Sequence, residues 1–127
     1  MKNLAKYIDH TLLKPTSTLK DIQKLCREAK EYGFASVCVH PHYVKFAAKE
    51  LKGSSSQLCT VIGFPLGANL PAIKAAEAMK AVEEGATEVD MVMNMSAFKS
   101  QNYSLVEEDI RAVVESVGQK ICVKVIL

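Results

Sequence analysis

Short apolar runs alternate with amphipathic stretches along the whole chain. Between the runs, apolar residues recur every three or four positions, which is the period of a helix with one buried face. Alternating strands and helices predict an α/β fold with a parallel sheet and helical crossovers. The five runs expected to be strands are Tyr7–Leu12, Ala35–Val39, Leu58–Ile62, Glu88–Met93 and Ile121–Ile126.

The first two predicted helices have clear boundary signals. Thr18 is followed three positions later by Asp21, the spacing of a capping box, and Gly33 is expected to end this helix. Pro41 breaks the second strand, and a helix is predicted over His42–Leu51. A short helical turn is also expected before the first strand.

The last two helices are expected to start at polar caps. Asn69 is the predicted cap of a helix that has Pro71 in its first turn and ends near Gly85. Ser104 and Glu107 have capping-box spacing for the last helix.

Polar residues on the strands share one parity. Strands of a parallel sheet covered on both faces are usually almost wholly apolar, so these exceptions are informative. If the sheet curves into a barrel, the polar faces converge inside it, and ionisable groups there should pair. Such pairing indicates either an active site or an ion pair that only neutralises itself. The polar positions are Asp9, Thr11, Ser36, Cys38, His40, Asp90, Asn94, Cys122 and Lys124.

The histidines, the glycine-containing loop and the methionines each have both a structural and a functional interpretation. His10 and His42 are expected at the surface or in turns, whereas His40 is a candidate for lining a pocket. The Gly63–Gly67 loop suits either an anion cradle or a simple turn. The methionines of the fourth strand, Met91 to Met95, have the spacing of core residues.

Composition narrows the class of protein. The 127 residues suffice for one domain, and the hydrophobic fraction of 49% excludes a disordered chain. No apolar run approaches the roughly 20 residues of a membrane span, so no membrane partner is expected. A net charge of +2 with no basic run gives no indication of nucleic-acid binding.

The four cysteines are widely scattered, and no C-x-x-C pair occurs. This spacing favours buried, reduced thiols over a zinc site, and we expect no metal. The first residues, Met1 to Leu4, do not begin a signal-peptide core. Both observations predict a cytoplasmic protein.

The final residues, Ile121–Leu127, form an apolar run with no cap or polar tail after it. An exposed strand of this kind offers unpaired backbone groups to another chain. We therefore expect the N-terminal part of a longer protein, which as an isolated chain forms a homodimer or a higher homo-oligomer.

Five segments, in order and over nearly the whole chain, resemble deoxyribose-phosphate aldolases. This family folds as a TIM barrel, a (β/α)8 fold of roughly 250 residues. The resemblance implies that residues 1–127 form the N-terminal part of one barrel domain, with its first five strands and without strands six to eight. The segments are Ile8–Pro15, Tyr32–Val39 with Pro41, Cys59–Ala68, Glu88–Val92 with Asn94, and Cys122–Leu127.

The family's members are class I aldolases, lyases that act in deoxyribonucleotide catabolism without a metal or other cofactor. They cleave the phosphorylated sugar 2-deoxy-D-ribose 5-phosphate to acetaldehyde and D-glyceraldehyde 3-phosphate through a lysine Schiff base. By resemblance, Asp90 is the proton donor and acceptor and Lys124 a supporting lysine, while Asp9, Thr11 and Cys38 line the substrate cavity.

The same resemblance places the Schiff-base lysine and the phosphate-binding groups beyond Leu127, so the chain alone is expected to be inactive. Three positions depart from the family pattern. Relatives usually have glycine at Ser96 and Gln101, and asparagine or an aromatic residue at His40.

Two other interpretations remain open at this level. One is a non-catalytic α/β module, for example a doubly wound sheet that binds a phosphorylated ligand at its strand ends. The other is an assembly element, a half-barrel that completes itself with a second copy.

Overall fold

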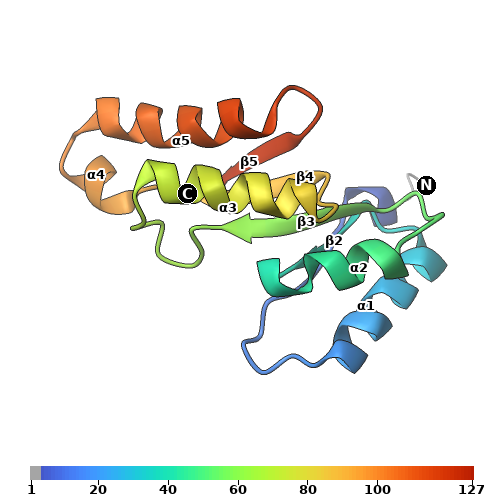
Figure 1. Cartoon of the computed structure of the whole chain (residues 1–127). Coiled ribbons are helices and arrows are strands. Elements are labelled where there is room, and N and C mark those ends of the chain that lie inside the picture. Colours follow the sequence, from blue (N-terminus) through green and yellow to red (C-terminus); the bar gives the residue numbers. More distant parts are fainter. Residues whose placement is uncertain (1–3) are drawn as a thin grey trace.

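Backbone hydrogen bonds join each strand to the strand that precedes it in the chain. The computed structural model describes residues 4–127, so the predicted absence of a signal segment rests partly on residues outside the described ones. The sheet order is β1-β2-β3-β4-β5, and all four neighbouring pairs are parallel (Figure 1). The strands are β1 Asp9–Leu12, β2 Ser36–Val39, β3 Gln57–Ile62, β4 Glu88–Val92 and β5 Cys122–Ile126.

This order confirms the predicted parallel (β/α) arrangement. A doubly wound sheet reverses its strand order at a switch point, and the observed order contains no reversal. The doubly wound alternative is therefore wrong. Right-handed crossovers that all advance in one direction place their helices on one face of the sheet.

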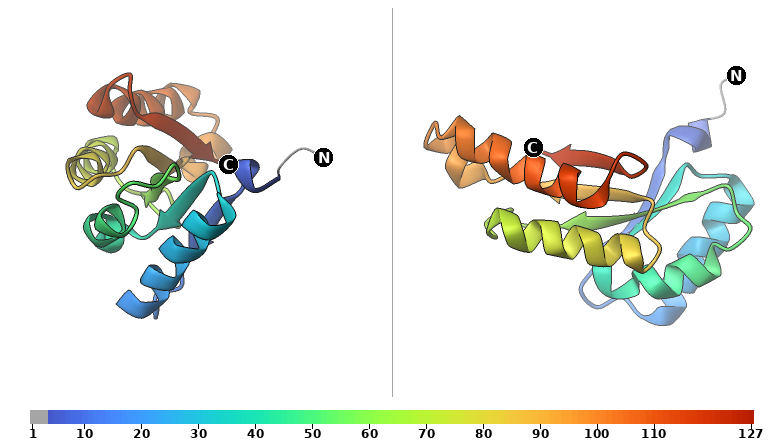
Figure 2. Two further views of the ribbon diagram at one scale, coloured as in Figure 1. Left: turned by 90° about the vertical axis from the view of Figure 1, so that its right-hand side faces the viewer. Right: turned by 45° about the horizontal axis from the view of Figure 1, so that its top comes forward.

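The helices lie along the outer, convex side of the curved sheet (Figure 2). No helix among residues 4–127 combines the length and apolarity needed to cross a membrane. The helical elements are η1 Leu4–Tyr7, α1 Leu19–Tyr32, η2 Pro41–Tyr43, α2 Val44–Glu50, α3 Pro71–Glu83, α4 Met95–Lys99 and α5 Tyr103–Val117, where η marks a 3-10 helix. The 3-10 turn η1 is the helical turn expected before the first strand. It includes Tyr7, which was predicted to begin that strand.

The capping box of α1 is confirmed. The backbone N–H of Thr18 donates to Asp21 Oδ2 at 2.8 Å, and the N–H of Asp21 donates to Thr18 Oγ1 at 3.4 Å. The helix ends as expected at Gly33, whose N–H donates to the carbonyl of Ala29 at 2.9 Å.

The predicted cap of α3 is wrong. Its N-cap is Leu70 rather than Asn69, and no side chain closes this end. The first helical residue is Pro71, which has no N–H to satisfy, so the helix begins without a polar cap.

The predicted capping box of α5 is also wrong. Its N-cap is Asn102, whose Oδ1 accepts hydrogen bonds from the N–H of Leu105 at 3.2 Å and from Ser104 Oγ at 2.9 Å. Ser104 therefore lies inside the first turn, because the amide oxygen two residues earlier already accepts from the helix.

The short helix α4 was not predicted. Asn94, which follows β4, caps it by accepting from the N–H of Ala97 at 3.0 Å. The chain leaves this helix through Gln101, which has a φ of +57°, a left-handed conformation that favours glycine. The resemblance placed a glycine at this position in relatives, and the backbone conformation accounts for it.

Alternate residues of each strand separate two apolar regions. The larger region lies between sheet and helices and includes fully buried Val37, Val89 and Met91. Met91 confirms the expectation that the methionines belong to the core. Met95 contradicts it, because β4 has ended and Met95 starts α4 with half of its surface exposed.

One buried ion pair lies between α3 and α5 and was missed in the sequence. Lys74 and Asp109 have no exposed side-chain surface, and Lys74 Nζ lies 2.5 Å from Asp109 Oδ2. Lys74 also donates to the carbonyl of Val92 at 2.8 Å. Lys74 precedes Ala78 by four positions and Ala81 by seven, and both alanines are buried on the same helix. This helical spacing was the sequence feature that could have predicted the burial of Lys74.

Candidate active site

The concave face of the sheet gathers charged side chains around Lys124 on β5. Its Nζ lies 2.9 Å from Asp9 Oδ2, 3.0 Å from Glu88 Oε2 and 3.3 Å from Asp90 Oδ1. These are carboxylates from β1 and β4, so the predicted convergence of Asp9, Asp90 and Lys124 is confirmed. We call these four residues the Lys124 cluster.

Strand register explains how the cluster forms. Asp90 and Lys124 are direct partners in the β4–β5 ladder, and Glu88 lies two positions before Asp90 on the same face. Glu88 was missed in the sequence although it has the same parity as Asp90. A glutamate at the start of a strand is ordinarily solvent-exposed, so parity was the only signal.

Asp9 is held from two directions. Ser36 Oγ on β2 donates to its Oδ1 at 2.7 Å, while Lys124 binds its Oδ2. Burial acts to raise the pKa of Asp9, but the hydrogen bonds from Ser36 and Lys124 outweigh it and hold the pKa below its usual range. Thr11, predicted beside the cavity, is exposed and donates to the backbone carbonyl of Asp9 at 2.8 Å.

Lys124 is held in its cationic form. Burial acts to lower its pKa, but the hydrogen bond to Asp9 and the neighbouring acidic groups, including Glu88 and Asp90, raise the pKa above its ordinary value. A lysine in this setting is a fixed positive charge at neutral pH.

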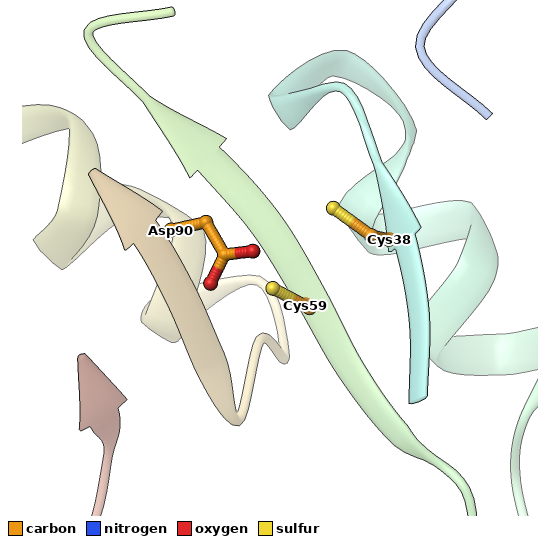
Figure 3. A group of neighbouring side chains, drawn as sticks. All are labelled: Cys38, Cys59 and Asp90. Atoms are coloured by element: carbon orange, nitrogen blue, oxygen red, sulfur yellow. The ribbon is translucent and has the colours of Figure 1, made fainter. Parts of the chain in front are cut away.

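Two thiols adjoin the cluster. Cys38 on β2 and Cys59 on β3 are register partners, and Figure 3 shows both sulfur atoms on the same side as the Asp90 carboxylate. The ligand atoms of Cys38, Cys59 and Asp90 all lie within 4.8 Å of one another. The hydrogen bond with Cys38, burial and the charge of Asp90 together raise the pKa of the Cys59 thiol. Cys59 was not predicted as a site residue, because only its register with Cys38 marks it.

Two of the three histidines, His10 and His40, hydrogen-bond to other groups of the chain. His40 Nε2 lies 2.8 Å from the carbonyl oxygen of Leu13, and its ring meets that of Phe64 edge-on. His10 is half-buried, and its Nε2 lies 2.8 Å from Glu28 Oε2. The prediction that His10 lies at the surface is therefore only partly correct. His42 is exposed, as expected.

The Gly63–Gly67 loop is closed by groups of this chain. The N–H of Gly63 donates to Glu77 Oε2 at 2.8 Å, and the N–H of Gly67 donates to the carbonyl of Gly63 at 2.7 Å. The carboxylate of Glu77 on α3 thus occupies an N–H donor that a bound anion would need. This favours the interpretation of the loop as a turn over an anion-binding site.

Comparison with known proteins gives matches over almost the whole chain. The family described as DeoC/LacD family aldolase matches residues 3–127. The deoxyribose-phosphate aldolase of Streptococcus gordonii is 60% identical over 124 residues, which are 98% of this chain and 56% of that protein. The enzyme of the same name from Clostridium novyi is 58% identical, with the same coverage of 98% and 56%. The chain spans about half the length of the curated relatives it matches.

Solved structures agree with the fold. A protein described as QR15, an aldolase, matches with a TM-score of 0.93 and 39% identity over 100% of this chain and 56% of that chain. The deoxyribose phosphate aldolase of Aeropyrum pernix, described as a unique tetrameric structure, matches with a TM-score of 0.86 and 36% identity, over 96% of this chain and 51% of that one.

Proposed function

The chain belongs to the DeoC/LacD family of aldolases, and we propose that it supplies the first five strands of a barrel that cleaves 2-deoxy-D-ribose 5-phosphate. The reaction is reversible and yields acetaldehyde and D-glyceraldehyde 3-phosphate. The observation that carries this proposal is the Lys124 cluster, in which an acid–base carboxylate adjoins a fixed cation on the concave face. In a barrel, this is the face that lines the interior.

Asp90 is the proposed proton donor and acceptor. Its Oδ1 is buried and accepts no hydrogen bond from the residues 4–127 that the structure describes. The Lys124 ammonium lies 3.3 Å from this oxygen and helps to hold the carboxylate in place. A positioned carboxylate of this kind typically contributes about 10²–10⁴-fold to a rate.

Lys124 is proposed as a supporting cation and not as the nucleophile. A lysine must be neutral to attack a carbonyl, whereas the carboxylates of Asp9 and Glu88 keep Lys124 protonated. A fixed cation lowers the pKa of a second lysine brought close to it, which is the activation that imine formation requires. The imine-forming lysine and the phosphate site would come from strands beyond Leu127.

Substrate binding is assigned by the same proposal to Asp9, Thr11 and Cys38 on β1 and β2. The proposed substrate is a small phosphorylated sugar, because the matched relatives are named deoxyribose-phosphate aldolases. All four cysteines are free thiols, which suits an enzyme of the reducing cytoplasm.

A chimera tests the proposal. The chain is joined to the remaining C-terminal part of the Streptococcus gordonii relative, and release of acetaldehyde from 2-deoxyribose 5-phosphate is measured. We expect turnover by the chimera and none by the 127-residue chain. Asp90→Asn should lower kcat by about 10²–10⁴-fold, while Glu31→Gln, an exposed carboxylate on α1, should leave it unchanged.

Two results would overturn these assignments. Near-normal turnover of the folded Asp90→Asn chimera would leave Asp90 only a structural counter-charge. Borohydride trapping with acetaldehyde should leave Lys124 unmodified, and stoichiometric labelling at Lys124 in the isolated chain would make it the nucleophile.

A further inference from the structure

The fold brings together two thiols that the sequence separates by 21 positions. Cys38 and Cys59 face each other on neighbouring strands, and the carboxylate of Asp90 on the next strand completes a group of three ligand atoms (Figure 3). The scattered spacing of the cysteines in the sequence argued against a metal site. In the fold, however, the register of β2 and β3 brings Cys38 and Cys59 together. We propose that Cys38, Cys59 and Asp90 form a binding site for a soft divalent cation, Cd²⁺ or Zn²⁺.

The geometry suits such an ion after a small contraction. With metal–sulfur bonds of about 2.3 Å, two tetrahedral sulfur ligands lie roughly 3.8 Å apart. The ligand atoms of the site lie within 4.8 Å of one another, so closure needs movements of about 1 Å or less. Three protein ligands leave a fourth position for water, and the paired thiolates favour a soft ion over Mg²⁺ or Ca²⁺.

Asp90 supplies the second, independent observation. Its Oδ1 is shielded from solvent and has no hydrogen-bond donor among the described residues. A buried carboxylate oxygen without a hydrogen-bond donor is only partly stabilised by a nearby ammonium group, and a bound cation would stabilise it further. The oxygen lies 3.3 Å from Lys124 Nζ, but Lys124 also donates to Asp9 and Glu88. Asp90 is therefore able to turn to a metal without leaving that ammonium group unpaired.

Binding changes the charge of the site. On binding, each thiol releases a proton to solvent, and two thiolates with one carboxylate carry three negative charges against the two of the ion. The Lys124 ammonium is shared with Asp9 and Glu88, so it offsets only part of the remaining negative charge. The inference concerns binding alone and does not depend on the proposed aldolase reaction.

The test is a titration of the reduced chain with Cd²⁺ in the absence of oxygen. We expect one ion per chain, with an ultraviolet thiolate-to-cadmium charge-transfer band whose intensity corresponds to two thiolates. Zn²⁺ should displace the band by competition. Cys38→Ser and Cys59→Ser should each halve the band and weaken binding by at least about tenfold.

Control variants separate this site from other thiols. Cys26 is buried in the core between sheet and helices, Cys122 is exposed on β5, and neither belongs to the group of three ligand atoms, so Cys26→Ser and Cys122→Ser should leave the titration unchanged. Asp90→Asn keeps both thiols in the fold and should weaken binding with the band intensity preserved. Equal Cd²⁺ binding by wild type and the Cys38→Ser/Cys59→Ser double variant, or loss of binding in Cys122→Ser, would overturn the proposal. Unweakened binding by Asp90→Asn would remove the carboxylate from it.

Discussion

Asp9 on the first strand and Lys124 on the fifth form an ion pair of 2.9 Å across the concave face of the sheet. Four strand spacings separate these strands, which amounts to roughly 19 Å in a flat sheet. The contact is possible only because the sheet is strongly curved and both side chains point to the centre of curvature. The ion pair therefore reports directly on the curvature of the whole sheet.

Removing the cation should destabilise the fold. Lys124→Met leaves Asp9, Glu88 and Asp90 without their shared partner, and we expect a loss of about 1–2 kcal/mol in the free energy of unfolding. The value is below that of a fully buried pair because about a third of the Lys124 side chain is exposed. Urea denaturation measures it, with Lys45→Met, an exposed lysine on α2, as the control. Identical midpoints for both variants would contradict the prediction.

The same ion pair predicts a dependence on pH. The folded-state pKa of Asp9 is depressed, so its stabilising contribution is present above the unfolded value of 3.8 and is lost as the pH falls through the lower folded value. Asp9→Asn should therefore be less stable than wild type at neutral pH, and the difference should shrink as the pH falls below 3.8. Unfolding curves from pH 6 down to about pH 2 test this. A difference that stays constant over this range would refute it.

The buried Lys74–Asp109 pair should show strong coupling. Lys74→Met leaves a carboxylate buried and unpaired, which costs about 3–5 kcal/mol of the free energy of unfolding. Adding Asp109→Leu removes that carboxylate and should recover most of the loss. A double-mutant cycle by urea denaturation measures the coupling. Strictly additive losses would show that the two side chains do not interact.

Two glycines with left-handed backbones form a matched pair. A Cβ on Gly67 (φ +64°) would lie 2.2 Å from the carbonyl oxygen of Met93, whereas a Cβ on Gly53 (φ +78°) meets nothing within 4 Å. Gly53→Ala should cost only the backbone strain, about 1–2 kcal/mol. Gly67→Ala adds the collision and should cost about 2–5 kcal/mol. Equal thermal midpoints for the two variants would show that the loop moves away freely.

Association is the last prediction. Leu127 is 89% exposed, and β5 has a paired neighbour on one side only within the described sheet. We expect light scattering at micromolar concentration to give at least twice the chain mass of 13.9 kDa. Ile126→Lys should shift the chain toward the monomer, and Leu19→Lys, at an exposed apolar position on α1, should not. A well-folded wild-type monomer would show that the chain covers this edge itself.

Periodicity predicted the fold and the centre of the site, because a period of two assigns every strand residue to one face. The convergence of Asp9, Asp90 and Lys124 followed from parity together with the expectation that the sheet curves into a barrel. Parity was not enough for Cys59, which is apolar enough to pass for core, and only the register with Cys38 marks it.

Packing decided the features that the sequence did not reveal. Lysine residues on helices are almost always exposed. Lys74 can be buried only because Asp109, on another helix, forms an ion pair with it. The cap of α5 was misplaced because Asn102 and Ser104 are both good caps, and local propensity does not choose between them.

The strand order has a consequence for the way the chain comes to be folded. Each strand pairs with the one synthesised just before it, so every βα unit finds its template already in place as the chain leaves the ribosome. The strand order is thus compatible with assembly from the first unit toward the last. The ion pair between Asp9 and Lys124 joins the first strand to the fifth, so it cannot form before β5 has been added to the sheet.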